Sequence, residues 1–155
     1  MALHFTKNEF KKRKLDTLES MKELNLDALL IFRQESMYWL TGYDTFGYVF
    51  FQTLILDKNG NIILLTRAPD LRQAQNTSNI KDIRIWVDKD GANPTDDLKL
   101  ILNELNLNNK KIGIEYEAYG MTGRNALKLN KSLENYCEVE DHSELITKHR
   151  VIKSQ

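Results

Sequence analysis

The 155-residue sequence predicts one α/β domain of three layers, in which helices flank a mixed, mostly parallel sheet. Short, continuous apolar runs such as residues 28–32 predict strands that are covered on both faces. Segments with a helical spacing of apolar residues alternate with these runs and favour parallel pairing. An Asn-Gly pair at 59–60 joins two strand-like segments and predicts an antiparallel hairpin.

The first predicted helix covers residues 7–24. Thr6 and Glu9 have the spacing of a capping box, in which each side chain can accept a hydrogen bond from the other residue's exposed backbone N–H. Phe5 and Phe10 occupy the two positions of a hydrophobic staple around that cap. Both patterns place the start of the helix directly after Thr6.

A short helix and a hairpin follow the first strand. The helix at 35–43 should end near Gly42, because glycine is a common residue at helix C-termini. Residues 48–56 are rich in aromatic and β-branched side chains and predict a strand. A turn at 57–60 then returns the chain along 62–66 as the hairpin partner.

Helices and strands alternate in the second half of the chain. Asn93-Pro94 predicts a helix start, with asparagine as the cap and proline at the first helical position. No internal repeat or linker-like composition interrupts the chain, so we expect a single domain. The predicted elements of this half are a short helix at 68–75, a strand at 83–87, a helix that begins at Pro94 and buries Leu98, Ile101, Leu102 and Leu105, a strand at 111–115, a helix at 122–133, a strand at 136–139 and a helical turn at 143–148.

Composition and charge exclude several classes of protein. Twenty-two basic and 22 acidic residues give no net charge, and therefore no general field that attracts nucleic acid or an anionic membrane. No stretch approaches the roughly 20 apolar residues of a membrane helix, and no apolar segment of a secretory signal follows Met1. The single cysteine, Cys137, cannot form an internal disulfide and fits a reducing compartment. We therefore expect a cytoplasmic protein with no nucleic-acid or membrane partner.

The sequence contains no recognisable catalytic motif. It lacks the His-Glu-x-x-His, Walker, Gly-x-Gly-x-x-Gly and nucleophile-elbow patterns. The three histidines, His4, His142 and His149, are scattered between the two ends, so surface or structural roles are expected. Cys137 lies in a predicted strand and is expected to be a buried, unreactive thiol. We therefore predict no catalytic residue and no metal site within this chain.

Aromatic residues are concentrated between positions 38 and 51. Core packing is one interpretation, above all for Tyr38, Trp39 and Phe51. A half-exposed aromatic wall that meets a ligand or a partner chain is the other. Composition alone leaves both interpretations open.

Four segments together resemble the N-terminal domain shared by creatinase, prolidase and ectoine hydrolase. They are NLDALLI at 25–31, ESMYWLTGY at 35–43, IGIE at 112–115 and RVIKS at 150–154. The resemblance implies the α/β fold predicted above, with a creatinase-type N-terminal domain at 1–149. It also implies that residues 150–155 begin the linker to a catalytic domain that this chain does not contain.

The resemblance further implies an active site outside this chain. In peptidases of this family a separate "pita-bread" domain binds two divalent, Mn-like metal ions, which activate water. The expected function is a non-catalytic, dimerisation and substrate-access domain of a metallopeptidase of the Xaa-Pro dipeptidase or aminopeptidase type. Its expected partners are its own catalytic domain, a second subunit and a small peptide or amide substrate.

Two substrate-facing positions follow from the same resemblance. In creatinase-like members an aromatic residue and an arginine face the substrate, and an ungapped comparison places them at Tyr48 and Phe50. Tyr48 keeps the aromatic character, whereas Phe50 cannot make the bidentate contact of arginine to a carboxylate. This departure argues against creatine as the substrate.

Two alternatives stay open at the level of sequence. The chain could be the N-terminal domain of a creatinase-like or ectoine hydrolase-like amidohydrolase instead of a peptidase. It could also be a stand-alone binding or dimerisation module.

Overall fold

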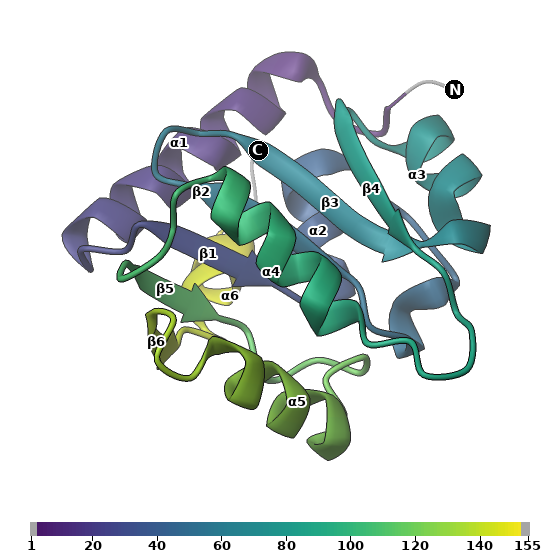
Figure 1. Cartoon of the computed structure of the whole chain (residues 1–155). Coiled ribbons are helices and arrows are strands. Elements are labelled where there is room, and N and C mark those ends of the chain that lie inside the picture. Colours follow the sequence, from purple (N-terminus) through teal and green to yellow (C-terminus); the bar gives the residue numbers. More distant parts are fainter. Residues whose placement is uncertain (1–2, 153–155) are drawn as a thin grey trace.

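The computed structural model of the chain describes residues 3–152, which form one six-stranded mixed sheet (Figure 1). The strand order is β4-β3-β2-β1-β5-β6. Only β2 runs against its neighbours β1 and β3, and the other three pairs are parallel. This arrangement confirms the predicted mixed, mostly parallel sheet. The strands are β1 (Ala28–Ile31), β2 (Thr53–Asp57), β3 (Ile62–Arg67), β4 (Asp82–Trp86), β5 (Lys111–Ile114) and β6 (Glu138–Asp141).

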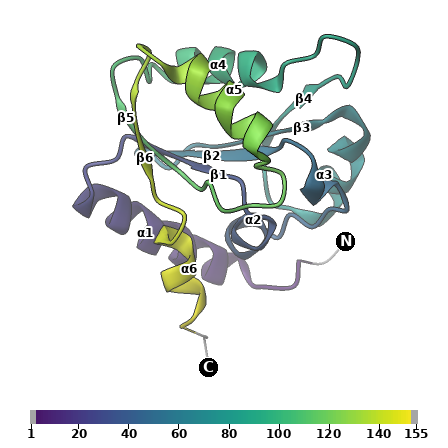
Figure 2. The ribbon, with the colours of Figure 1, turned by 90° about the horizontal axis from the view of Figure 1, so that it is seen from below.

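Helices cover both faces of the sheet and complete the predicted three layers. In Figure 2, α4 and α5 lie above the sheet, and α1, α2 and α6 lie below it. Two short 3-10 turns, η1 (Gly47–Val49) and η2 (Ala68–Asp70), flank the β2–β3 hairpin. The helices are α1 (Lys7–Glu23), α2 (Gln34–Thr41), α3 (Leu71–Thr77), α4 (Pro94–Glu104), α5 (Gly123–Leu133) and α6 (Leu145–Arg150).

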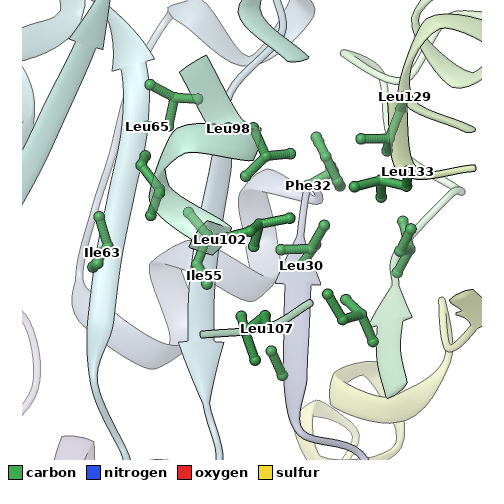
Figure 3. Packing of buried hydrophobic residues seen from close by; sticks show 14 of the residues in the cluster. Leu30, Phe32, Ile55, Ile63, Leu65, Leu98, Leu102, Leu107, Leu129 and Leu133 are labelled. Carbon is green, nitrogen blue, oxygen red and sulfur yellow. The ribbon is translucent and has the colours of Figure 1, made fainter. Parts of the chain in front are cut away.

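The sheet separates two hydrophobic cores. All four residues of β1 are buried, because alternate side chains enter opposite cores. Leu30 meets α4 and α5 in the core shown in Figure 3, while Leu29 and Ile31 pack toward α1 and α2. Coverage on both faces explains why the first strand is a continuous apolar run in the sequence.

The predicted helix boundaries at α1 and α2 are confirmed. The backbone N–H of Glu9 donates to Thr6 Oγ1 at 3.2 Å, and the rings of Phe5 and Phe10 meet edge to face at 5.8 Å. At the end of α2, Gly42 adopts a φ of 80° and its N–H donates to the Tyr38 carbonyl at 2.8 Å. Glycine reaches this left-handed conformation without the steric cost of a side chain.

Three local predictions are wrong. Residues 48–52 are not part of a strand, because η1 occupies 47–49 and β2 begins only at Thr53. The last strand is β6, two residues beyond the predicted start, because Asn135 takes a left-handed turn with φ 56°. At α4 the positions of the N-cap residue Asn93 and of Pro94 are confirmed, but the side-chain cap is not: Asn93 Oδ1 accepts from Thr95 Oγ1 and receives no backbone N–H of the helix.

The predicted linker falls at the edge of the described chain. Residues 153–155 lie outside the described residues, and Arg150 is the last residue of α6. Within residues 3–152, none of the helices combines the length and the apolar character that crossing a bilayer requires.

Candidate functional site

The carboxyl ends of β1 and β5 lie side by side and form the candidate site. The two strands are parallel and neighbouring, with Leu30 opposite Ile114. The chain leaves β1 toward β2 on one side and returns through α4 to β5 on the other side. Such a change of direction leaves a crevice beyond the strand ends, where open α/β sheets commonly bind ligands.

A buried carboxylate lies at these strand ends. Glu115 directly follows β5 and has no exposed surface. Its Oε2 accepts the backbone N–H groups of Phe32 at 3.2 Å and Arg33 at 2.9 Å. Its Oε1 accepts the Ser36 hydroxyl at 2.8 Å. Glu115 therefore ties the end of β5 to the start of α2.

Burial raises the pKa of Glu115 to about 7. Removal from water disfavours the ionised carboxylate, and the hydrogen bonds from Arg33, Ser36 and Phe32 only partly offset that effect. All three donors come from the segment of residues 32–36, so the carboxylate joins that segment to the end of β5.

Arg33 links three segments around the same crevice. Its guanidinium donates to the Glu117 carbonyl at 3.0 Å, to Glu117 Oε2 at 3.1 Å and to Thr147 Oγ1 at 2.5 Å. These contacts occupy Nε, Nη2 and Nη1 in turn. The cation therefore connects β1 to the segment after β5 and to α6.

Two glycines let the loops at this edge pack closely. A Cβ on Gly47 would lie 2.5 Å from Asp70 Oδ2, and one on Gly120 would lie 2.3 Å from the Phe50 carbonyl oxygen. Thr45 Oγ1 donates to buried Asp70 and accepts the N–H of Gly47, which fixes η1 against the hairpin. Gly120 therefore lies against the backbone of residues 48–50, and Gly47 lies against the Asp70 side chain.

The structure brings Tyr48 and Phe50 to this edge, on η1 and the residue after it, and not on the predicted strand. Tyr48 is 39% exposed and meets the ring of Tyr119 edge to face at 5.6 Å. Phe50 is 41% exposed, and the guanidinium of Arg67 lies 3.5 Å from its ring centre. Arg67 Nε in turn donates to Asp70 Oδ2 at 3.1 Å. Contact of these two side chains with a substrate stays a prediction.

The aromatic segment divides between core and surface. Phe51 and Tyr43 are buried, and the Tyr43 hydroxyl donates to Gln52 Oε1 at 2.9 Å. Tyr38 and Trp39 are half-buried and pack against the ends of the chain. The exposed apolar residues of the two loops, which we call the aromatic face, are Phe46, Tyr48, Val49, Phe50 and Tyr119.

A pocket of about 430 Å³ lies beside the aromatic face, and we call it the switch-point pocket. Larger hollows include one of about 1050 Å³ along α1 and the β3–β4 edge, one of about 960 Å³ between α1 and α6, and one of about 680 Å³ between α1 and the turn at 58–59. The second shares Tyr116 and Glu117 with the switch-point pocket. The switch-point pocket is lined by Arg33, Gln34, Glu35, Tyr48, Tyr116, Glu117, Ala118 and Tyr119.

The histidines make side-chain contacts within the fold, whereas Cys137 is half-buried and lies directly before β6, not in a strand as predicted. His4 bonds the Tyr38 hydroxyl, His142 bonds Glu140, and His149 bonds Ser20. Burial raises the pKa of the Cys137 thiol to about 11, which keeps it protonated at neutral pH. Within residues 3–152, no three His, Cys, Asp or Glu side chains converge as metal ligands.

The sequence placed Glu115 in the IGIE segment without revealing its role, and it did not single out Arg67. Glu115 directly follows an apolar strand, and a carboxylate at that position can point into the interior. Its hydrogen-bond partners, however, are about 80 positions away in the sequence. Arg67 ends β3, and nothing in the local sequence places it on the ring of Phe50.

Comparison with known proteins gives a consistent set of relatives. A model of the creatinase/prolidase N-terminal domain matches residues 13–152. An uncharacterized hydrolase/peptidase, y4tM, of Sinorhizobium fredii is 27% identical over 160 aligned residues. The alignment covers 99% of this chain and 41% of that protein, so the chain spans less than half the length of its curated relative.

Solved structures share the fold. A dipeptidase from Pyrococcus horikoshii superposes with a TM-score of 0.73 at 24% identity, over 92% of this chain and 37% of that one. A prolidase from Thermococcus sibiricus gives 0.75 at 19% identity, over 94% and 38%. An Xaa-Pro aminopeptidase chain from Streptococcus thermophilus gives 0.70 at 19% identity, over 91% and 98%. In that last case the solved chain is itself about the size of this domain.

Proposed function

Because this chain belongs to the creatinase/prolidase N-terminal domain family, we propose that it is the non-catalytic N-terminal domain of a longer Xaa-Pro dipeptidase or aminopeptidase. The match of the family model to residues 13–152 is the observation that carries the proposal. The relative from Sinorhizobium fredii has 59% of its length outside the alignment, which is room for a catalytic domain. Its description as a hydrolase/peptidase, together with the dipeptidase and aminopeptidase among the structural relatives, supports the class of reaction.

In this proposal the metal chemistry belongs to the catalytic domain. Two adjacent divalent ions in such a peptidase would activate water and stabilise the tetrahedral intermediate. The donors within residues 3–152 do not fit such a centre, because no three candidate ligands converge. Glu115, the most deeply buried carboxylate of this part of the chain, is already engaged by three donors. The Mn-like ions would therefore have their ligands elsewhere.

We assign the aromatic face to contacts beyond this domain. Its five side chains are between 39% and 88% exposed and lie at one edge of the sheet. Contiguous exposed apolar surface commonly marks a contact with another protein or with a ligand. We propose that it walls the active site of a second subunit in a homodimer, with Tyr48 and Phe50 toward the peptide substrate. We place the protein in the cytoplasm, a location that its single thiol, Cys137, fits.

The test uses the longer protein that carries this domain. Tyr48→Ala should raise the KM for an Xaa-Pro dipeptide at least fivefold and change the melting temperature by less than about 3 °C, because a partly exposed ring contributes little to the core. Leu127→Ala, which truncates a 74% exposed side chain on α5, is the matched control and should change neither quantity. A Tyr48 variant that loses stability and activity in proportion would instead indicate core packing.

A further inference from the structure

The switch-point pocket contains polar groups without partners. Among the described residues, the Glu35 carboxylate makes no hydrogen bond or ion pair. The Tyr48 and Tyr119 hydroxyls likewise have no hydrogen-bond partner there, and the only recorded ring contact of either is with the other. The Glu35 carboxylate and the rings of Tyr48 and Tyr119 all line the switch-point pocket. The pocket therefore presents one free negative charge beside two accessible aromatic rings.

The charge balance of the pocket singles out Glu35. Arg33 and Glu117 also line it, but they neutralise each other through an ion pair at 3.1 Å. The remaining guanidinium nitrogens of Arg33 donate to the Glu117 carbonyl and to Thr147. All three guanidinium nitrogens of Arg33 are thus engaged, and Glu144 Oε1 also lies 3.9 Å from Nη2. The Glu35 carboxylate, in contrast, has no ion-pair partner among the described residues, so a cationic ligand would find it uncompensated.

We propose that the switch-point pocket binds a small organic cation, an alkylammonium group, through Glu35 and the rings of Tyr48 and Tyr119. Electron-rich aromatic faces attract such cations, and a nearby carboxylate supplies the opposite charge. The position at the change of strand direction is where open α/β sheets bind ligands. Its volume of about 430 Å³ suits a small group such as an alkylammonium.

Two kinds of ligand present an alkylammonium group: the amino end of a short peptide and the side chain of a lysine on another protein. The ligand site is independent of the hydrolase assignment, because it needs only residues of this chain. A titration of the 155-residue chain alone therefore tests the ammonium site separately from the peptidase assignment. Failure of either proposal would not refute the other.

The experiment follows backbone amide shifts of the ¹⁵N-labelled chain during titration with three probes. The first is a dipeptide amide with a free amino end, the second is its N-acetylated form, and the third is Nα-acetyl-lysinamide. We expect saturable shifts at Glu35, Tyr48 and Tyr119 with an ammonium-bearing probe and none with the neutral N-acetylated peptide. Binding of the first probe alone identifies a peptide amino end, and binding of the third alone identifies a lysine side chain.

Variants test the assigned charge. Glu35→Gln should weaken binding of the ammonium probe at least fivefold, while Glu19→Gln, a carboxylate on the exposed surface of α1, should leave it unchanged. Addition of salt should weaken binding because the attraction is screened. Equal shifts with the neutral peptide, no saturable shift with either ammonium probe, or unaltered binding by Glu35→Gln would each overturn the proposal.

Discussion

Replacement of Glu115 by glutamine should remove a pH dependence from the stability of the fold. Glutamine matches the carboxylate in shape, and its carbonyl can accept the N–H groups of Phe32 and Arg33 in place of Oε2. The amide NH₂ can donate to the Ser36 hydroxyl, which then acts as acceptor. The variant therefore keeps all three hydrogen bonds and loses only the ionisable group.

The sign and size follow from the raised pKa. A pKa of about 7 in the fold, against the ordinary 4.5, means that the folded chain holds the proton more tightly than the unfolded chain. This contribution to stability is fully present below pH 4.5 and is lost as pH rises through 7. At about 1.4 kcal/mol per pH unit, the loss amounts to roughly 3 kcal/mol between pH 4 and pH 8.

Urea unfolding, followed by the fluorescence of Trp39 and Trp86, measures this pH-dependent contribution of Glu115 to the free energy of unfolding. The free energy of unfolding of Glu115→Gln, relative to the unsubstituted chain, should rise by roughly 3 kcal/mol from pH 4 to pH 8. With a slope near 2 kcal/mol per molar urea, the midpoints should separate by about 1.5 M. Glu19→Gln should follow the unsubstituted chain at every pH. Parallel profiles for Glu115→Gln and the unsubstituted chain would refute the reasoning.

Three further substitutions or reactions test the geometry. Gly120→Ala should lower the free energy of unfolding, measured by thermal unfolding, by more than about 2 kcal/mol, because its Cβ would meet the Phe50 carbonyl oxygen at 2.3 Å. Gly123→Ala places its Cβ in open space and should be neutral in the same assay. Thr6→Ala should cost about 1 kcal/mol of stability, seen in thermal unfolding, since it removes the cap of α1. Cys137 should react with iodoacetamide at pH 8 far more slowly than a free thiol, and rapid labelling would contradict the raised pKa.

Local patterns sufficed where local contacts decide the structure. The cap at Thr6, the staple of Phe5 on Phe10 and the left-handed Gly42 all involve residues within five positions of each other. The continuous apolar run of β1 likewise revealed coverage on both faces. These signals are enough to give the three-layer α/β class.

Distant contacts decided what the sequence did not reveal. Residues 48–52 have strand-like composition, yet Gly47 is held against Asp70, 23 positions later, and the chain turns there before β2. The interior role of Glu115 depends on Phe32 and Ser36, about 80 positions earlier. Windows of local sequence contain neither partner, so the prediction placed Tyr48 and Phe50 on a strand, whereas they lie on and directly after η1. Both side chains are partly exposed, and their contact with a substrate stays a prediction.

The most direct test of the proposed function is hydrolysis of an Xaa-Pro dipeptide in the presence of Mn²⁺ by two proteins in parallel: this 155-residue chain and the longer protein that carries it. The account predicts proline release by the longer protein and no release above the protein-free control by the chain alone. Turnover that scales with the concentration of the isolated chain would contradict a non-catalytic domain, and an inactive longer protein would contradict the peptidase assignment.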